Sequence, residues 1–207
     1  FQAERVGWPI PHIGTTAGKK TYGYEPTVSH LFRIIPPADL LSGTQIKIAA
    51  SPRWQICDET NCRPEPGIGA PDNLVAVTLT VGPALSLVSA NTQAFAESRA
   101  MLPATLPAEL KVQAREREGL VTLILSPSEA IPDKKIHFYD FDQVLDAQSE
   151  PIVVREGNEV RWSMPLNTDT DRPLGEAISG ILTIGEEGYE VNASLGDRED
   201  EHVSFGK

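Results

Sequence analysis

The stretch Trp54-Gln-Ile-Cys-Asp-Glu-Thr-Asn-Cys-Arg-Pro64 contains Cys57 and Cys62, the two cysteines of the 207-residue sequence. A disulfide between them requires Cα atoms about 4.4–6.8 Å apart, whereas the same residues in an extended strand would span roughly 16 Å. The chain must therefore turn between them. Asp58 and Asn61 suit a turn, because their side chains bond readily to nearby backbone. We expect a short hairpin with one cysteine on each arm.

Three interpretations of this pair are open. The disulfide could cycle between oxidised and reduced forms, which is the interpretation we favour. It could be a structural staple, although closing so small a ring stabilises a fold by only about 2 kcal/mol. The cysteines could also be free thiols or metal ligands. Two thiolates are only half of a zinc site, however, and no further His or Cys lies nearby at ligand spacing. We therefore expect no metal ion and no other cofactor.

Positive and negative side chains near the cysteines have opposite effects on the acidity of the two thiols. Arg53 and Arg63 flank the pair, whereas Asp58 and Glu59 lie between its members. Cations favour a thiolate and anions disfavour it. The sequence therefore does not decide which thiol is the more acidic.

Composition excludes several classes of protein. The formal net charge is −11 with no basic stripe to offset it, which argues against nucleic acid as a partner. No apolar run reaches the length of a membrane span. The sequence begins Phe1-Gln-Ala-Glu4 without a signal peptide, so we interpret it as a mature or excised fragment. A lone disulfide candidate fits an oxidising compartment such as a bacterial periplasm.

Short apolar runs separated by turn residues predict a chain made mostly of strands. In the first segment, to residue 88, strands are expected at residues 28–35, 45–50 and 74–81, where apolar and polar residues alternate. At residues 89–103 we expect a short helical connector, capped by Asn91 or Thr92, with Phe95, Arg99 and Leu102 on one face. In the second segment the expected strands are 109–115, 120–125, 136–141, 151–155, 159–164, 178–184 and 189–193. Two hairpins are expected among them, with turns at Gly157-Asn158 and at Gly185-Glu-Glu-Gly188.

Several of these stretches resemble a known family, the periplasmic N-terminal domain of the thiol:disulfide interchange protein DsbD, and especially its ScsB-like relatives. The matching stretches are Trp8-Pro-Ile-Pro11, Thr21-Tyr-Gly-Tyr-Glu25, and Trp54 to Cys57 with Cys62-Arg-Pro64, and the specific ones among them are the last two. Weaker similarity continues into the connector at Phe95-Ala-Glu-Ser-Arg-Ala-Met-Leu-Pro103 and the second β domain at Ile136-His-Phe-Tyr139, Gly180-Ile-Leu-Thr183 and Tyr189-Glu-Val191. Four residues separate the cysteines here, a spacing that differs from that of the relatives.

The resemblance and the strand pattern together imply an all-β fold class: two immunoglobulin-like β-sandwich domains joined by a short helix. We expect a redox domain at residues 1–88, a connector at 89–103, a second β-sandwich at 104–195 and a polar tail at 196–207. Relatives carry further strands before the Trp8 region, so the first domain could be incomplete at its N-terminus, or it could be completed by the second domain or by a partner chain.

The family implies that Cys57 and Cys62 are the catalytic pair of a protein-disulfide reductase. Electrons would arrive from a membrane-embedded domain of the same full-length protein and pass to periplasmic thioredoxin-like proteins or disulfide isomerases, with Cys62 engaging the partner. A cap loop with an aromatic residue shields the disulfide in this family; Tyr22 falls at that position, and Tyr24 is a second candidate. The implied location is the periplasm, tethered to the inner membrane.

Two alternatives come from different classes of protein. The chain could be a non-enzymatic periplasmic binding or assembly module in which Cys57–Cys62 is structural. Relatives are also linked to cytochrome c biogenesis and to copper tolerance, so copper handling is a third and weaker hypothesis.

Overall fold

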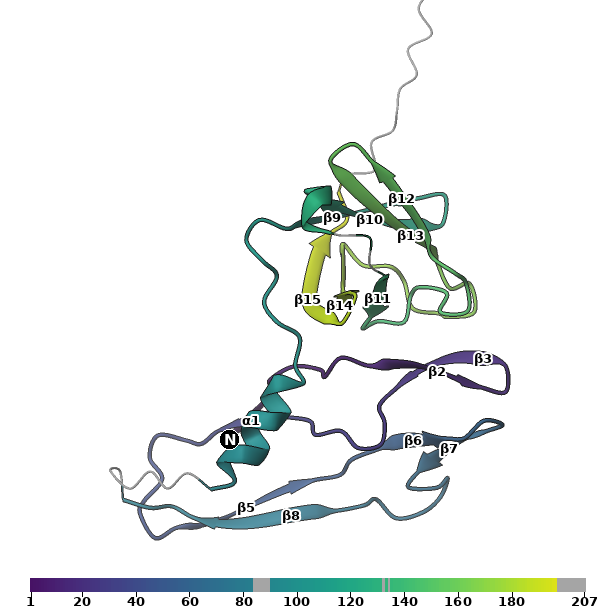
Figure 1. Cartoon of the computed structure of the whole chain (residues 1–207). Coiled ribbons are helices and arrows are strands. Elements are labelled where there is room, and N and C mark those ends of the chain that lie inside the picture. Colours follow the sequence, from purple (N-terminus) through teal and green to yellow (C-terminus); the bar gives the residue numbers. More distant parts are fainter. Residues whose placement is uncertain (84–89, 132, 134, 197–207) are drawn as a thin grey trace, which may run out of the picture. The chain divides into compact units, whose positions relative to one another are not determined.

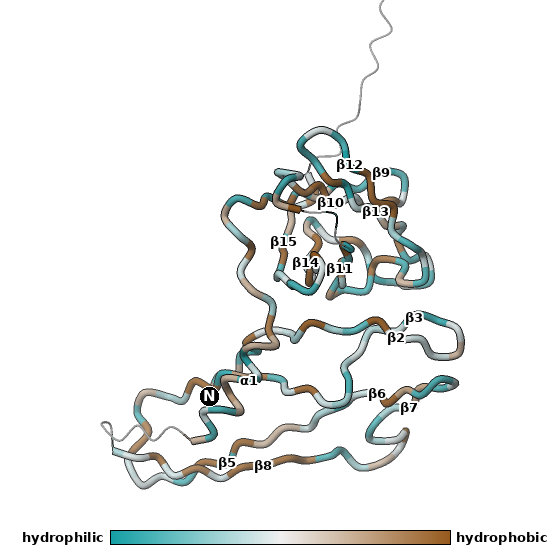
Figure 2. The backbone as a smooth tube through the Cα atoms, viewed as in Figure 1, coloured by the Kyte–Doolittle hydropathy of each residue, from teal (hydrophilic) through white to brown (hydrophobic). Residues whose placement is uncertain are grey.

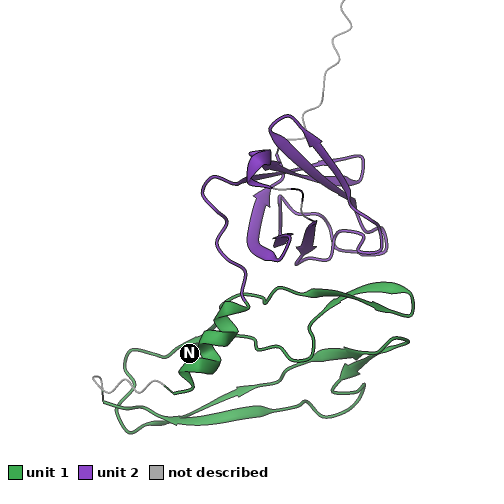
Figure 3. Cartoon of the chain, in the orientation of Figure 1, with its two compact units in different colours: residues 1–101 green, residues 102–207 purple. Residues whose placement is uncertain are grey.

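The computed structural model of the chain describes residues 1–83, 90–131, 133 and 135–196. It divides the chain into two compact units, Phe1–Met101 and Leu102–Lys207 (Figure 3). Strands dominate both units, and α1 (Thr92–Ala100) is the one α-helix of the described residues (Figure 1). The predicted fold class, all-β and immunoglobulin-like with a short helix, is confirmed. The finer domain boundaries stay predictions, and the predicted tail lies almost wholly outside the described residues.

Unit 1 consists of four antiparallel two-stranded ribbons. Their strands are β1 (Gln2–Arg5) with β4 (Phe32–Ile35), β2 (His12–Thr16) with β3 (Lys19–Gly23), β5 (Gln45–Ala50) with β8 (Val75–Thr80), and β6 (Trp54–Cys57) with β7 (Cys62–Glu65). A two-stranded ribbon is only marginally stable alone, so contacts between ribbons must support each one.

Unit 2 is a sandwich of two antiparallel sheets. One sheet has the order β12 (Ile152–Glu156), β13 (Glu159–Pro165), β10 (Leu120–Ser126), β9 (Lys111–Arg117). The other has the order β11 (Ile136–Asp140), β14 (Ala177–Ile184), β15 (Glu187–Ser194). The short 3-10 helix η1 (Ser128–Ala130) follows β10. Alternating residues of both sheets face inward and form one core, which includes Val121, Leu123, Leu125, Phe138, Trp162 and Leu182.

Two hairpins of unit 2 form where turn residues predicted them. The β12–β13 hairpin turns at Gly157, whose φ of 56° suits a residue without a Cβ. The β14–β15 hairpin is tighter than the predicted four-residue turn, because Ile184 already pairs with Glu187. The positions of both turns were therefore predicted from the sequence, whereas the length of the second turn was not.

Unit 1 buries far less than unit 2. In the part of unit 1 that the structure describes, the buried residues are Pro9, Thr16, Leu31 and Ser98. The β5–β8 ribbon illustrates the contrast, since Ile46 pairs with Leu79 and Ile48 with Val77 on one apolar face. Figure 2 shows this hydrophobic character along β8. Val77 is nevertheless 50% exposed, so this face has little cover in unit 1.

The helix α1 belongs to unit 1, because the amide nitrogen of Ile10 donates to the Met101 carbonyl at 3.2 Å. Asn91 is its N-cap residue, but its side chain makes no capping hydrogen bond. Phe95, which the sequence places on one face with Arg99 and Leu102, is exposed, and the buried residue of the helix is Ser98. Ser98 Oγ donates to the Ala94 carbonyl at 2.7 Å, and this internal bond allows a hydroxyl to be buried there.

Candidate functional site

Cys57 and Cys62 form a disulfide across the end of the β6–β7 hairpin, as the spacing predicted. Cys57 is the last residue of β6 and Cys62 the first of β7, and the two lie directly opposite each other. Their Cα atoms are 4.0 Å apart, slightly closer than the usual range for a disulfide given above. Cys57 is exposed and Cys62 is half-buried. A sulfur atom of another protein can therefore approach the bond, which a disulfide inside a packed core would not allow.

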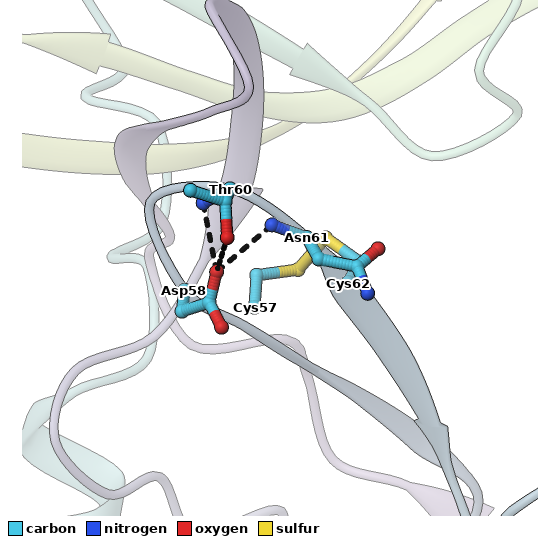
Figure 4. The surroundings of a disulfide bond; sticks show 5 residues. All are labelled: Cys57, Asp58, Thr60, Asn61 and Cys62. Carbon is cyan, nitrogen blue, oxygen red and sulfur yellow. Dashed lines mark hydrogen bonds between the residues drawn. A yellow bond between two sulfur atoms is a disulfide. The ribbon is translucent and has the colours of Figure 1, made fainter.

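The connection between the cysteines is organised by one carboxylate (Figure 4). Asp58 Oδ1 accepts three hydrogen bonds, from the amide of Thr60 at 2.7 Å, the hydroxyl of Thr60 at 2.8 Å and the amide of Asn61 at 2.8 Å. The Asp58 amide in turn donates to the Asn61 carbonyl at 2.9 Å. The Asp58 side chain thus accepts the hydrogen bonds of the turn's donors. Such local bonding is the reason that Asp and Asn are favoured in turns.

A second hairpin supports this turn from outside. The β2–β3 hairpin reverses at Ala17 and Gly18, with φ values of 51° and 76°. The Ala17 amide donates to the carbonyl of Glu59 at 2.8 Å. Figure 1 shows the two hairpins running side by side with their turns at the same end. The disulfide turn is therefore held both by its own carboxylate and by the tip of β2–β3.

Charges near the disulfide are largely paired. Arg53 bonds to Asp72, and Arg63 lies 3.6 Å from Glu65. The pKa of Asp58 is lowered from its ordinary value of 3.8, first by the hydrogen bonds from Thr60, then by the amide of Asn61 and the charge of Arg63. The Asp58 carboxylate is therefore a stable negative charge, next in sequence to Cys57, at all pH values where thiols react.

Tyr22 and Tyr24, the candidates for shielding the disulfide, lie in different surroundings. Tyr22 lies on β3, half-buried and paired with Ile13. Tyr22 lies five positions after Ala17, so at about 3.3 Å per residue it stands roughly 16 Å along the chain from the hairpin tip. The backbone bond to the disulfide turn comes from Ala17, which the sequence analysis did not select. The signal for it was the Ala17-Gly18 pair between two polar runs, which is typical of a two-residue turn.

Tyr24 belongs to an aromatic cluster outside the disulfide hairpin. Its hydroxyl donates to the Pro9 carbonyl at 3.1 Å, and its ring meets His30 edge-on at 5.6 Å. Trp8 meets the same His30 at 5.1 Å, and Arg5 stacks over Trp8 at 4.3 Å. Burial raises the pKa of Tyr24, so its hydroxyl stays protonated as a donor. The described contacts of Tyr24 are thus structural, and shielding by either tyrosine stays a prediction.

The described residues carry neither a metal-binding cluster nor a membrane-spanning helix. They contain no group of three or more His, Cys, Asp or Glu side chains that could hold a metal ion. Among them, no helix has both the length and the apolar character needed to cross a membrane.

Comparison with known proteins supplies one informative match. No family model matches the sequence, and no curated protein matches it. Among solved structures, the N-terminal periplasmic domain of ScsB from Proteus mirabilis is similar, with a TM-score of 0.58 and 16% sequence identity. The match covers 95% of this chain and 77% of that domain. At this identity the match shows a shared fold, which extends over both units of the chain.

Proposed function

We propose that this chain is a thiol–disulfide exchange module in which Cys57 and Cys62 alternate between disulfide and dithiol. One observation carries the proposal: the disulfide lies on an exposed hairpin turn, with Cys57 open to solvent. The fold shared with the periplasmic domain of ScsB supports it, as does the resemblance of the cysteine stretch to the DsbD family.

The proposed reaction transfers two electrons and two protons to a partner. In the dithiol form, the Cys62 thiolate attacks one sulfur of the partner's disulfide, and the partner's other sulfur leaves as a thiolate that takes up a proton. The Cys57 thiolate then attacks Cys62 Sγ in the mixed disulfide. The Cys57–Cys62 bond forms, and the partner's second sulfur leaves as a thiol. Assigning the first attack to Cys62 follows the family resemblance.

We propose a periplasmic location and two kinds of partner. A membrane-embedded domain of the same full-length protein would supply a dithiol that reduces Cys57–Cys62 again. Thioredoxin-like proteins or disulfide isomerases of the periplasm would accept the electrons. The proposal includes shielding of the disulfide by the β2–β3 hairpin, with Tyr22 and Tyr24 as the aromatic residues concerned.

Redox titration of the purified chain in glutathione buffers tests the proposal. Structural disulfides of secreted proteins have reduction potentials below about −300 mV, whereas exchange proteins of the thioredoxin class lie between about −270 and −120 mV. We expect the Cys57–Cys62 potential to lie above about −300 mV. A lower value would identify a structural bond. As a second readout, Cys57→Ser leaves Cys62 to form a mixed disulfide with a partner, which a matched Cys57→Ser, Cys62→Ser variant cannot form.

The second candidate is a binding or assembly module with a structural disulfide. The apolar face of the β5–β8 ribbon favours it, because exposed apolar patches often mark interaction surfaces. The double serine variant separates the two functions. A binding module would lose about 2 kcal/mol of stability and keep its partner, whereas an exchange module would stay folded and lose electron transfer.

A further inference from the structure

The bonds that organise the disulfide turn do not involve sulfur. All three donors to Asp58 Oδ1 belong to Thr60 and Asn61, and the bond between the Asp58 amide and the Asn61 carbonyl is backbone only. Reducing the Cys57–Cys62 bond therefore removes none of these hydrogen bonds. These hydrogen bonds can therefore keep the turn closed when the two sulfur atoms are not bonded.

The Asp58 carboxylate also takes over a backbone function. In a regular two-residue hairpin the amide of the fourth turn residue would donate to the carbonyl of the first. Here the Asn61 amide donates to the Asp58 side chain instead, at 2.8 Å. The carboxylate thus joins the first and last residues of the connection, which are the neighbours of Cys57 and Cys62.

We propose that Asp58 is a positioning residue for thiol–disulfide exchange: its carboxylate keeps the turn closed in the dithiol form, so that the Cys57 and Cys62 thiols remain within reach of each other. The inference rests on the proposed function. Asp58 takes no part in the bonds made and broken. It acts on the closing step, in which one thiolate attacks the mixed disulfide held by the other cysteine.

The direction of the effect follows from effective concentration. Closing a disulfide is favoured when the two thiols are held near each other, because less chain freedom is lost as the bond forms. Removing the carboxylate would release the turn in the dithiol form, lower the effective concentration of one thiol near the other, and make the disulfide easier to reduce. The negative charge beside Cys57 acts in the same direction, because it disfavours the thiolate. The experiment must therefore separate the effect of the Asp58 oxygen on turn closure from the effect of the Asp58 charge on the thiolate.

Three substitutions make this separation. Asp58→Ala removes both the acceptor oxygen and the charge. Asp58→Asn removes the charge and keeps a carbonyl oxygen that can accept from Thr60 and Asn61. Glu59→Gln is the matched control, since it removes a charge from the same turn while the Glu59 backbone carbonyl still accepts from Ala17.

The measurement is the equilibrium of each variant with glutathione at one pH, together with the fraction present as a mixed disulfide with glutathione. For Asp58→Ala we expect the equilibrium to shift about tenfold toward the dithiol, which is about 30 mV, and the mixed disulfide to accumulate. For Asp58→Asn and Glu59→Gln we expect shifts of about threefold or less. Thr60→Val, which removes only the hydroxyl donor, should fall between the wild type and Asp58→Ala, and it tests the inference even if Asp58→Ala does not fold.

Two results would overturn the inference. Equal shifts in Asp58→Ala and Asp58→Asn would show that charge acts alone, and an unshifted Asp58→Ala would show that the turn closes without the carboxylate. Failure of the proposed function looks different, because there the wild-type disulfide itself resists glutathione. In that case the same variants are compared in dithiothreitol, and the shift of Asp58→Ala still decides whether the carboxylate promotes closure.

Discussion

The amide nitrogen of Ala17 donates to the carbonyl oxygen of Glu59 at 2.8 Å and joins the tips of two hairpins that are distant in sequence. Ala17 has a φ of 51°, a left-handed conformation that glycine adopts more easily than alanine. The disulfide turn is therefore held by a residue whose conformation is unfavourable for its own side chain. This relationship can be tested at a single position.

Ala17→Pro should loosen the disulfide turn, because proline has no amide hydrogen and its ring holds φ near −65°. We expect the disulfide to be reduced by dithiothreitol about fivefold faster, which corresponds to the loss of one hydrogen bond of about 1 kcal/mol. Ala17→Gly is the control, since it keeps the amide and accepts a positive φ. A rate in Ala17→Pro equal to that of Ala17→Gly would contradict this role of the hairpin tip.

Tyr22→Ala tests the shielding part of the proposal. If the Tyr22 side chain limits access to the disulfide, the variant should react several-fold faster with reduced glutathione. Tyr24→Phe should instead lower the free energy of unfolding by about 1 kcal/mol, because the Pro9 carbonyl loses its donor, and should leave the reaction rate unchanged. An unchanged rate in Tyr22→Ala would remove shielding by Tyr22 from the proposal.

His30 predicts a pH dependence of unit 1. Burial lowers its pKa from the ordinary value of 6.5, and the charge of Arg5 lowers it further. The unfolded chain therefore binds this proton more readily than the folded chain. The contribution of His30 is complete above pH 6.5 and is lost as the pH falls toward its folded pKa. The midpoint of thermal unfolding should fall between pH 7.5 and 5 by less in His30→Gln than in the wild type; equal falls would contradict the assignment.

Gly180→Ala should destabilise unit 2. A Cβ at this position would overlap the Tyr139 carbonyl oxygen and lie 2.7 Å from Cζ of Phe138, a residue of the core. We expect a loss of about 3 kcal/mol in the free energy of unfolding, because backbone must move to make room. Gly175→Ala is the matched control in the same unit, where the nearest atom would lie at an ordinary 3.7 Å. Thermal unfolding followed by the fluorescence of buried Trp162 measures both.

The sequence predicted those features that depend on neighbours along the chain. Cys57 and Cys62 could meet only if the chain turned between them, so the hairpin followed from covalent geometry. The strands expected at residues 120–125 and 159–164 likewise correspond to β10 and β13, which their local composition predicted. Asp58 was recognised as turn material, although the convergence of three donors on one oxygen required coordinates.

Features that depend on distant residues escaped prediction. The strand pair β1–β4 joins residues about thirty positions apart, and no local pattern encodes that partnership. The Ala17–Glu59 bond is of the same kind. In α1 the spacing of residues places Phe95 on one face, but the residue that packing buries is Ser98, whose hydroxyl donates a hydrogen bond within the helix. Helix periodicity describes only the helix, whereas burial depends on what lies against it.

The Cys57–Cys62 bond encloses only the four residues of its turn, and every other strand pairing of unit 1 lies outside that small ring. Breaking the bond therefore leaves the remaining ribbons covalently and topologically unchanged. Under the proposed function, unit 1 would need no refolding step between one electron donation and the next, and encounters with partners would set the rate of turnover. Hydrogen exchange in the two oxidation states should accordingly differ only around the turn.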